Sequence, residues 1–237
     1  VYSSYSSAFR VPSLNQLFDR RPIDVDFGFG PLAFYLSNPG LKPQRAKSFE
    51  VGGRWDRSDH SYAMLTLYSI WVREEIDFDA TTFTYANLDK SRHRGVQIAA
   101  QQRVVGPVAF QASGTYSPTE LDGGPNDGHQ INAVPRGTAY GRLSWEHGDQ
   151  WSIDGGVRYA GYQFLDKENQ HRLNDFATVE AGASAKLEKI RVVLRIGNLL
   201  DRKYADTGYL LDLGSFGIAE ERLSPAAERS FTISITS

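Results

Sequence analysis

The residue types that most often perform catalysis are scattered along this sequence of 237 residues. No His-Glu-x-x-His motif, Gly-x-Ser-x-Gly motif or phosphate-binding loop occurs, and the histidines stand far apart, at positions 60, 93, 129, 147 and 171. The segment "GFGPLA", residues 28–33, has only a superficial match to a dinucleotide fingerprint, because Pro31 stands inside it and no strand and helix flank it. The sequence therefore predicts neither an enzyme nor a bound cofactor.

Two acid-rich stretches could do chemistry of other kinds. "REEIDFDA" (73–80) supplies the paired acids that a hydrolase needs, although a solvated strand end explains them equally well. "DGGPNDG" (122–128) could bind calcium through Asp122 and Asp127, but it lacks the regular spacing of a calcium loop and is typical of a flexible turn. We expect no metal site in either stretch.

Composition excludes further classes of function. Charged residues make up 23% of the chain and the formal net charge is −2, so there is no basic surplus to neutralise a nucleic acid. The absence of cysteine excludes disulfides and thiolate metal sites. The partners that remain are small molecules, proteins and membranes.

The elements that would position any site are strands. Apolar Phe49, Val51 and Trp55 alternate with polar Glu50 and Arg54, and the same period of two recurs along the chain. The fold class is therefore all-β, and we predict ten strands, over residues 1–10, 46–56, 60–79, 82–103, 107–118, 134–147, 150–162, 174–187, 190–200 and 228–237.

The connections between these strands alternate in length. Short turns stand at 56–60, 104–107, 147–150 and 187–190, and the long connections are 11–45, 119–133, 163–173 and 201–227. Only the short connection near Ala80 breaks this contrast. An antiparallel up-and-down meander with one short-turn end and one long-loop end is typical of an outer-membrane β-barrel.

The two faces of the strands support a membrane barrel. The apolar face would contact lipid, and the charged face would line a wet lumen with Arg54, Asp154, Arg158, Glu180, Arg191 and Arg195. Aromatic residues stand near both strand ends, as expected at membrane interfaces: Trp55, Trp145 and Trp151 beside short turns, and Tyr116, Tyr159 and Tyr162 toward long loops. Two alternatives stay open: a complete ten-stranded outer-membrane barrel with a protease-like rim, and a soluble β-barrel or sandwich that binds a partner.

Four stretches resemble the C-terminal barrel region of TonB-dependent outer-membrane receptors, in the order in which that family has them. They are "AFRVPSLNQLF" (8–18), "NPGLKPQRAKSFEVG" (38–52), "YANLDKSRHRGVQI" (85–98) and "RIGNLLDRKYAD" (195–206). We expect structural roles for the motif residues, since prolines fix the chain direction, Gly95 allows a close approach or bulge, and the polar residues can end strand pairing. These residues are Phe9, Arg10, Pro12, Asn38, Pro39, Leu41, Pro43, Gly95, Asn198, Leu199, Asp201 and Tyr204.

The resemblance implies a larger protein. Family members have about 22 strands and an N-terminal plug, so residues 1–237 would be the C-terminal portion of the barrel, without the plug and the first strands. TonB would act through an N-terminal part that is not visible here, and outer-membrane lipid would surround the barrel. The chain starts inside a strand without a signal peptide, and it ends at Ser237 where the family usually has an aromatic residue. We therefore expect a fragment with open strand edges, whose native C-terminus is missing or whose assembly is altered.

The resemblance also implies a cargo, which would be a scarce nutrient, most simply an iron–siderophore complex. Haem receptors of the family usually carry a histidine between the first two motifs, and residues 11–37 contain none. Arginine and aromatic side chains could hold an anionic, aromatic ferric siderophore, although each aromatic could equally pack inside its own loop. The candidate ligand residues are Arg20, Arg21, Phe27, Phe29, Phe34, Tyr35, Tyr209 and Phe216.

Overall fold

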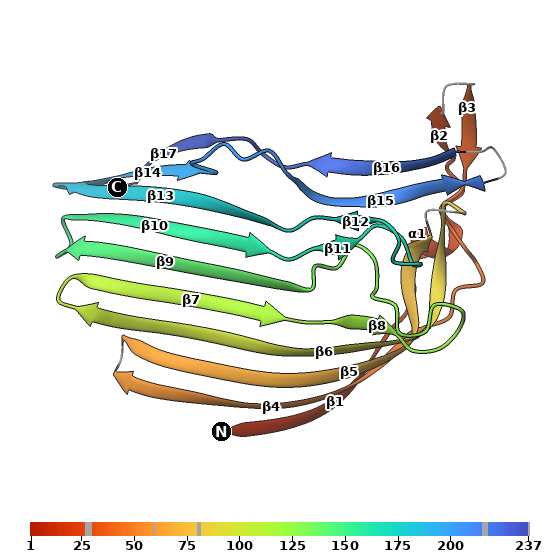
Figure 1. Cartoon of the computed structure of the whole chain (residues 1–237), viewed down its shortest axis with the longest axis horizontal. Helices are drawn as coiled ribbons and strands as arrows, with labels where there is room; N and C mark the ends of the chain where they lie inside the picture. Colours follow the sequence, from red (N-terminus) through yellow and green to blue (C-terminus); the bar gives the residue numbers. More distant parts are fainter. Residues whose placement is uncertain (27–29, 59, 80–81, 215–217, 237) are drawn as a thin grey trace.

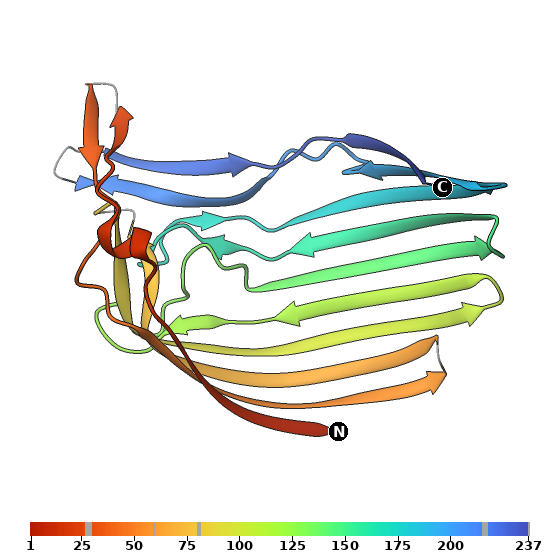
Figure 2. The ribbon, with the colours of Figure 1, turned by 180° about the vertical axis from the view of Figure 1, so that it is seen from behind.

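The computed structural model describes residues 1–26, 30–58, 60–79, 82–214 and 218–236. Its main element is a curved, antiparallel sheet of 11 strands (Figures 1 and 2). Ten of them form an up-and-down meander, in which each strand pairs with the strand of this set that comes before it and the one that comes after it in the sequence. They are β1 (Tyr2–Arg10), β4 (Gln44–Ser58), β5 (Ser61–Asp79), β6 (Thr84–Val105), β7 (Val108–Tyr116), β9 (Gly137–His147), β10 (Trp151–Ala160), β13 (Phe176–Leu187), β14 (Ile190–Gly197) and β17 (Ser230–Thr236). The ten strands predicted from alternation are confirmed, with bounds that move by a few residues.

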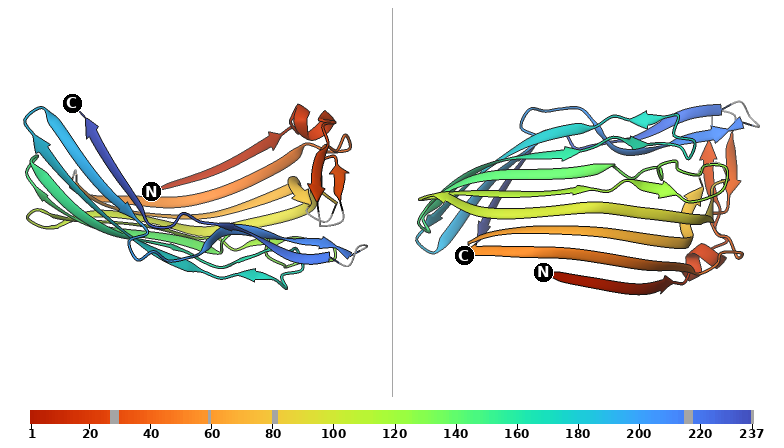
Figure 3. Two further views of the ribbon diagram at one scale, coloured as in Figure 1. Left: turned by 90° about the horizontal axis from the view of Figure 1, so that it is seen from above. Right: turned by 60° about the horizontal axis from the view of Figure 1, so that its bottom comes forward.

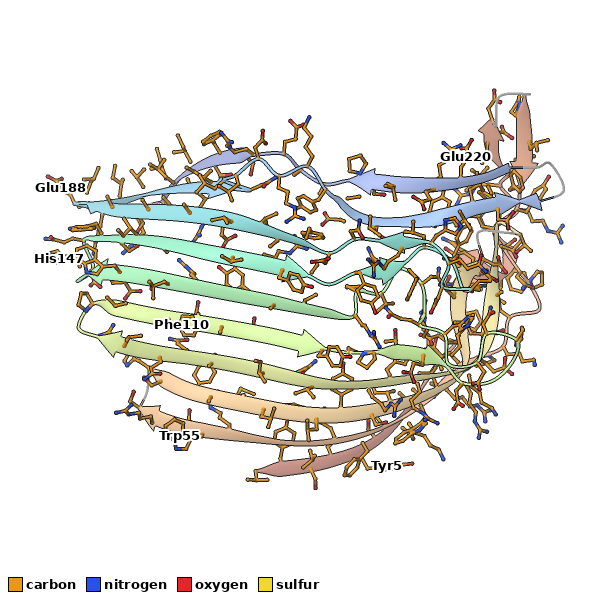
Figure 4. The ribbon with its side chains drawn as sticks, in the orientation of Figure 1. Tyr5, Trp55, Phe110, His147, Glu188 and Glu220 are labelled. Carbon is orange, nitrogen blue, oxygen red and sulfur yellow. The ribbon has the colours of Figure 1, made fainter. Side chains whose placement is uncertain are left out.

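Tight turns join the strands at one end of the sheet, which we call the short-turn end. Gly106, Gly148 and Glu188 each have φ of 53° there, the left-handed conformation that tight hairpin turns of two or three residues use. Figure 4 places Trp55, His147 and Glu188 at this end and Glu220 at the opposite, long-loop end. The rings of Trp145 and Trp151 lie 4.1 Å apart beside the turn, as expected of an interfacial aromatic belt.

The register gives the sheet two chemically different faces. On the polar face, Arg142 of β9 lies opposite Gly156 of β10, and Asp154 lies opposite Gly182 of β13. On the apolar face, large hydrophobic side chains are exposed, including Leu67 at 44%, Ile153 at 52% and Phe231 at 71%. Such an apolar surface would be a liability in water, and an apolar band of this kind is what a lipid-facing barrel wall presents.

The sheet is an open trough. Seen from above in Figure 3, the edge strands β1 and β17 rise on the same side of the middle strands. Within the described ranges β1 pairs only with β4, and β17 pairs only with β14. These ten strands therefore do not close into a complete small barrel, in contrast to one alternative left open by the sequence.

The four long connections contain elements that the alternation pattern does not predict. They are α1 (Leu14–Phe18), β2 (Ile23–Asp26), β3 (Pro31–Phe34), β8 (Thr119–Leu121), β11 (Gln163–Phe164), β12 (Arg172–Leu173), β15 (Ala205–Leu213) and β16 (Ile218–Pro225). α1 is short for a helical period to be visible, and it is held by a capping box in which Ser13 and Gln16 bond each other's backbone. The alternation pattern does not reveal the strands among them, because these short hairpins are stabilised by contacts between loops.

The short connection between β5 and β6 has a simple explanation. A membrane-spanning strand needs about 9–11 residues, whereas β5 has 19 residues and β6 has 22. The two strands therefore continue past the wall as a hairpin, and this hairpin replaces a long loop. Ala80, at its tip, lies outside the described residues. No helix in the described part of the chain is both long and apolar enough to cross a membrane.

Candidate functional site

The elements at the long-loop end pack together through an apolar cluster. Phe83 and Leu211 are buried at its centre, with Val25, Phe34 and Phe78 against them. The Phe34 and Phe83 ring centroids are 4.5 Å apart, and the Phe78 ring meets Phe83 edge-on at 5.9 Å. The hairpins β2–β3, β5–β6 and β15–β16 thus share one small core.

Backbone hydrogen bonds join the remaining loops to this core. The Leu210 amide donates to the Leu165 carbonyl at 2.9 Å, and Leu165 is only 2% exposed. Gln130 and Asn169 exchange two bonds of 2.7 and 2.8 Å, which connect loop 122–136 to loop 165–171. The loops therefore form one interlocked layer, visible as the crowded side of Figure 1.

Two of the sequence motifs contact each other in this layer. Asn38 donates through Nδ2 to the Tyr85 carbonyl at 2.9 Å, and its Oδ1 accepts from the Gly40 amide at 2.9 Å. Asn87 accepts from the Lys42 amide at 2.8 Å and donates to the carbonyls of Lys42 and Glu74. The "NPGLKP" segment is therefore fixed to the start of β6, and the buried Leu41 lies between these bonds.

The "NLLD" motif ends β14 in a similar way. Asn198 has φ of 47°, and its side chain bonds the backbone of Arg202 in both directions at 2.9 Å. Asp201 has φ of 54° and accepts from the Arg229 amide at 2.9 Å, just before β17 begins. The Tyr204 ring lies 4.1 Å from that of Phe176. These contacts turn the chain out of the wall and return it at a fixed position.

The other motif residues lie at strand ends and in the wall. The Tyr68 ring covers Gly95 so closely that a Cβ there would be 2.5 Å from it. Phe9 is 76% exposed on the apolar face of β1, and Pro12 is half-buried after the strand. Pro39, Pro43 and Leu199 are exposed.

A polar cleft opens between the end of β1, α1 and the start of β6. It has a volume of about 590 Å³, within the usual range for small-molecule sites, and its lining includes Arg10, Asn15, Asp19, Arg21 and Tyr85. Arg21 forms a two-pronged ion pair with Asp19, with distances of 2.9 and 2.6 Å, and this guanidinium lowers the Asp19 pKa to about 2. Among the described residues, no carboxylate lies within ion-pair distance of Arg10. The cleft therefore contains Arg10, which has no ion-pair partner among the described residues, and Arg21, which is paired with Asp19. It also presents amide and hydroxyl groups and the aromatic ring of Tyr85.

The structure brings together only some of the candidate ligand residues. Arg21 lines the cleft, Arg20 points to solvent without lining it, and Phe34 lies in the apolar cluster. Tyr35 directly follows β3 and is 53% exposed, whereas Tyr209 lies in β15 and is 39% exposed. Phe27, Phe29 and Phe216 lie outside the described residues.

Sequence reasoning missed most residues of the cleft, among them Arg10, Asn15 and Tyr85. Arg10 was expected to have a structural role only, and Asn15 and Tyr85 were not considered as ligand groups. The signal that could have found them was the proximity of two motifs, since Arg10 and Asn15 lie in the first and Tyr85 opens the third. Asn38 brings these motifs to one place, because its backbone amide donates to the Gln16 carbonyl at 2.7 Å and its side chain donates to the Tyr85 carbonyl.

The acid-rich stretches form no catalytic or metal centre in the described residues. Glu75 accepts a hydrogen bond from Ser91, and its Oε2 lies 3.3 Å from His93 Nε2. The Ser91 hydroxyl contacts that same nitrogen at 3.1 Å, so no second ring nitrogen relays a proton between acid and hydroxyl. Asp127 accepts from the Gly123 amide within its own turn, and the described residues hold no cluster of metal-ligating side chains.

Comparisons with known proteins agree with this architecture. The family model described as "TonB dependent receptor-like, beta-barrel" matches residues 1–199. The chain is 21% identical over 223 residues to the "Probable TonB-dependent siderophore receptor PiuA" of Acinetobacter baumannii, covering 88% of this chain and 29% of that protein. It is 24% identical over 181 residues to the "Ferrioxamine receptor" of Yersinia enterocolitica, covering 71% and 25%. It is 26% identical to the "Vitamin B12 transporter BtuB" of Vibrio cholerae, covering 99% and 34%.

Solved structures give the same fold. The ferric yersiniabactin uptake receptor FyuA of Yersinia pestis superposes with a TM-score of 0.69 at 15% identity, covering 98% of this chain and 33% of that one. The copper transporter OprC superposes with a TM-score of 0.74 at 18% identity, covering 98% and 36%.

The chain belongs to the β-barrel family of TonB-dependent receptors. It is part of a bacterial outer-membrane barrel, so its polar face lines the lumen and its apolar face contacts lipid. The relatives named above are described as receptors and transporters, and none of these descriptions is that of an enzyme. It spans between 25% and 34% of the length of the curated relatives.

Proposed function

We propose that this chain is the C-terminal part of the barrel of an outer-membrane receptor that binds a ferric siderophore at its long-loop end and imports it with energy from TonB. The plug and the first strands of the barrel would be supplied by the rest of the receptor. This proposal extends the family membership to a particular cargo and a particular energy source.

The polar cleft is the observation that carries the proposal. Arg10 and Arg21 can donate charge-assisted hydrogen bonds to an anionic ligand, and Tyr85 can stack on an aromatic chelating group. The interlocked loops support a defined binding geometry, because they fix the cleft walls through the Asn38 and Asn87 bonds. Two of the curated relatives named above are a siderophore receptor and a ferrioxamine receptor.

Uptake of radioactive iron by cells that carry the native receptor, and no other iron receptor, tests the proposal. A panel of ferric siderophores should include one whose uptake depends both on the receptor and on TonB. Replacing Arg10 and Arg21 by glutamine should weaken binding of that siderophore about 10-fold or more, since a hydrogen bond to a charged group contributes about 1.5–3 kcal/mol. Lys203→Gln, an exposed cation in an outer loop paired only loosely with Glu228, is the matched control and should bind normally.

Cobalamin is the second candidate cargo, since the vitamin transporter named above aligns over 99% of this chain. Competition separates the two: unlabelled cobalamin should leave iron uptake unchanged if the cargo is a siderophore. Receptor-dependent cobalamin uptake without any receptor-dependent ferric siderophore uptake would overturn the first proposal.

A further inference from the structure

Cations gather on the apolar face of three neighbouring strands, directly beyond the lipid-facing hydrophobic residues. In β4 the apolar run ends with Phe49, and the next outward positions are Lys47 and Arg45. In β5 the outward residue Trp71 is followed by Arg73. In β6 the outward positions past the apolar run are Arg94, Arg92 and Lys90, and of these Arg94 and Arg92 pair with carboxylates. We call Arg45, Lys47, Arg73 and Lys90 the cationic groove.

The register opposes these charges to one another. Arg45 lies directly opposite Arg73, and Arg73 lies directly opposite Lys90. Like charges at paired positions of neighbouring strands are destabilising. Among the described side chains, no carboxylate lies within ion-pair distance of any member of the cationic groove, so the repulsion is not relieved inside the chain.

Other cations around the groove are neutralised. Lys42 pairs with Glu74 at 3.2 Å, and Arg92 pairs with Asp122 at 3.3 Å. Further down the wall, Arg94 pairs with Glu120 at 2.8 Å. The cations of the groove therefore have no ion-pair partner among the described side chains, whereas the neighbouring cations do.

The space between these side chains can hold a ligand. Two adjoining cavities of about 630 and 490 Å³ are both lined by Arg45, Arg73 and Lys90. Asp122 also lines both and Glu74 lines the larger, but these carboxylates pair with Arg92 and Lys42. Lys47 and Trp71 line only the second cavity, toward the apolar wall. Trp71 is 42% exposed, as expected for an aromatic residue at the membrane interface.

From this geometry we infer that the cationic groove binds the phosphate of an outer-leaflet lipid headgroup, while the acyl chains of the same lipid lie on the apolar face below. The position at the upper limit of the apolar wall selects a lipid over a soluble anion, since only a lipid can contact the groove and the wall together. At their long-loop ends β7 and β10 carry the tyrosines Tyr116 and Tyr159 on the outward face, so the site is confined to β4, β5 and β6. The inference depends on the barrel family alone and not on the cargo.

Binding of bisphosphorylated lipid A to the purified native receptor in a neutral detergent tests the inference. Each cation near a lipid surface contributes about fivefold to binding, so the triple variant Arg45→Gln, Arg73→Gln and Lys90→Gln should bind about 100-fold more weakly. The matched control removes three cations on the polar face, Arg54→Gln, Arg103→Gln and Arg191→Gln, and should bind lipid A as the native receptor does. The charge-conserving variant Arg45→Lys, Arg73→Lys and Lys90→Arg should retain binding within a few-fold.

Two further measurements separate the possible outcomes. In neutral detergent without lipid A the triple glutamine variant should melt at the same or a higher temperature, because opposed charges are removed. Dephosphorylated lipid A should bind native receptor and triple variant equally weakly. Equal binding of lipid A to the native receptor and the triple variant would overturn the inference. So would inorganic phosphate binding as tightly as lipid A, because the groove would then be a site for soluble anions.

Discussion

On the polar face of the wall Arg142 and Arg195 both lie beside Asp154, at 2.6 and 3.6 Å, whereas on the apolar face of the same sheet Arg45, Arg73 and Lys90 oppose one another without a carboxylate. Asp154 is only 4% exposed, and Glu180 nearby accepts from the Tyr140 hydroxyl at 2.5 Å. Side chains that face the lumen thus pair with one another within the protein. On the outward face at the membrane rim, Arg92 and Arg94 pair with carboxylates, whereas Arg45, Arg73 and Lys90 remain exposed to what surrounds the protein.

Glycines show the same difference between the faces. On the polar face a Cβ at Gly52 would be 2.7 Å from the Tyr2 ring, and one at Gly182 would be 2.8 Å from the Asp154 carboxylate. On the apolar face a Cβ at Gly141 would have nothing within 4 Å. On the polar face, protein side chains fill the space above these glycines, whereas on the apolar face the space above Gly141 is left to lipid.

A charge placed on the apolar face should have the largest effect. Leu67→Arg should lower the unfolding free energy of the native receptor by about 3 kcal/mol, since a cation near the bilayer midplane costs about 2–4 kcal/mol. Gln97→Arg, on the polar face of the neighbouring strand, should change it little. Denaturant unfolding in lipid vesicles measures both, and equal effects would mean that the two faces have been assigned wrongly.

Removal of the shared carboxylate should come next. Asp154→Ala leaves Arg142 and Arg195 facing each other, and it should cost about 2 kcal/mol, the range for hydrogen bonds to charged groups. Asp206→Ala removes a carboxylate that is 49% exposed and 3.9 Å from Arg158, so its effect on the same unfolding measurement should be close to zero. A similar loss in both variants would argue against a specific role for the Asp154 pairing.

Adding one methyl group should distinguish the faces more finely. Gly95→Ala forces the Tyr68 ring away from its position and should cost about 1 kcal/mol or more, as overpacking does. Gly141→Ala meets open space and should be neutral or slightly stabilising, because alanine loses less chain entropy on folding. Thermal unfolding of the two variants in one detergent provides the comparison, and a lower melting temperature for Gly141→Ala alone would contradict it.

Acidification should have the smallest effect, confined to the hairpin beyond the wall. Burial raises the Glu75 pKa, but the hydrogen bonds from His93 and Ser91 outweigh it, so the pKa lies below its usual value. A carboxylate with a lowered pKa stabilises the fold above its ordinary pKa, and this contribution is lost as the pH falls through the lowered value. The protection of residues 72–79 against hydrogen exchange, relative to the intrinsic exchange rate at each pH, should therefore decrease as the pH falls from neutral through the lowered Glu75 pKa, and Glu75→Gln should flatten the change. Unchanged protection in the native receptor would rule out this contribution.

The parts of the fold that follow from local alternation were predictable, and the parts that follow from contacts between loops were not. The ten wall strands were found because each alternates over seven or more residues. The hairpins β2–β3, β11–β12 and β15–β16 were missed, since their stability comes from partners such as Phe83 and Leu165 that are distant in sequence. The role of the aromatic candidates as ligand residues stays a prediction: Phe27, Phe29, Phe34, Tyr35, Tyr209 and Phe216. Of these, Phe34 packs against the apolar cluster of Phe83 and Leu211.

The sequence by itself determined the wall, its two faces and the alternation of short and long connections, because a period of two and turn residues act over a few neighbours. It also carried the family motifs. Only the tertiary structure decided that Arg10, Arg21 and Tyr85 line one cleft and that Arg45, Arg73 and Lys90 lie side by side on the wall. The physical reason is strand register, which is set by pairing over the whole sheet and places residues far apart in the chain at one position.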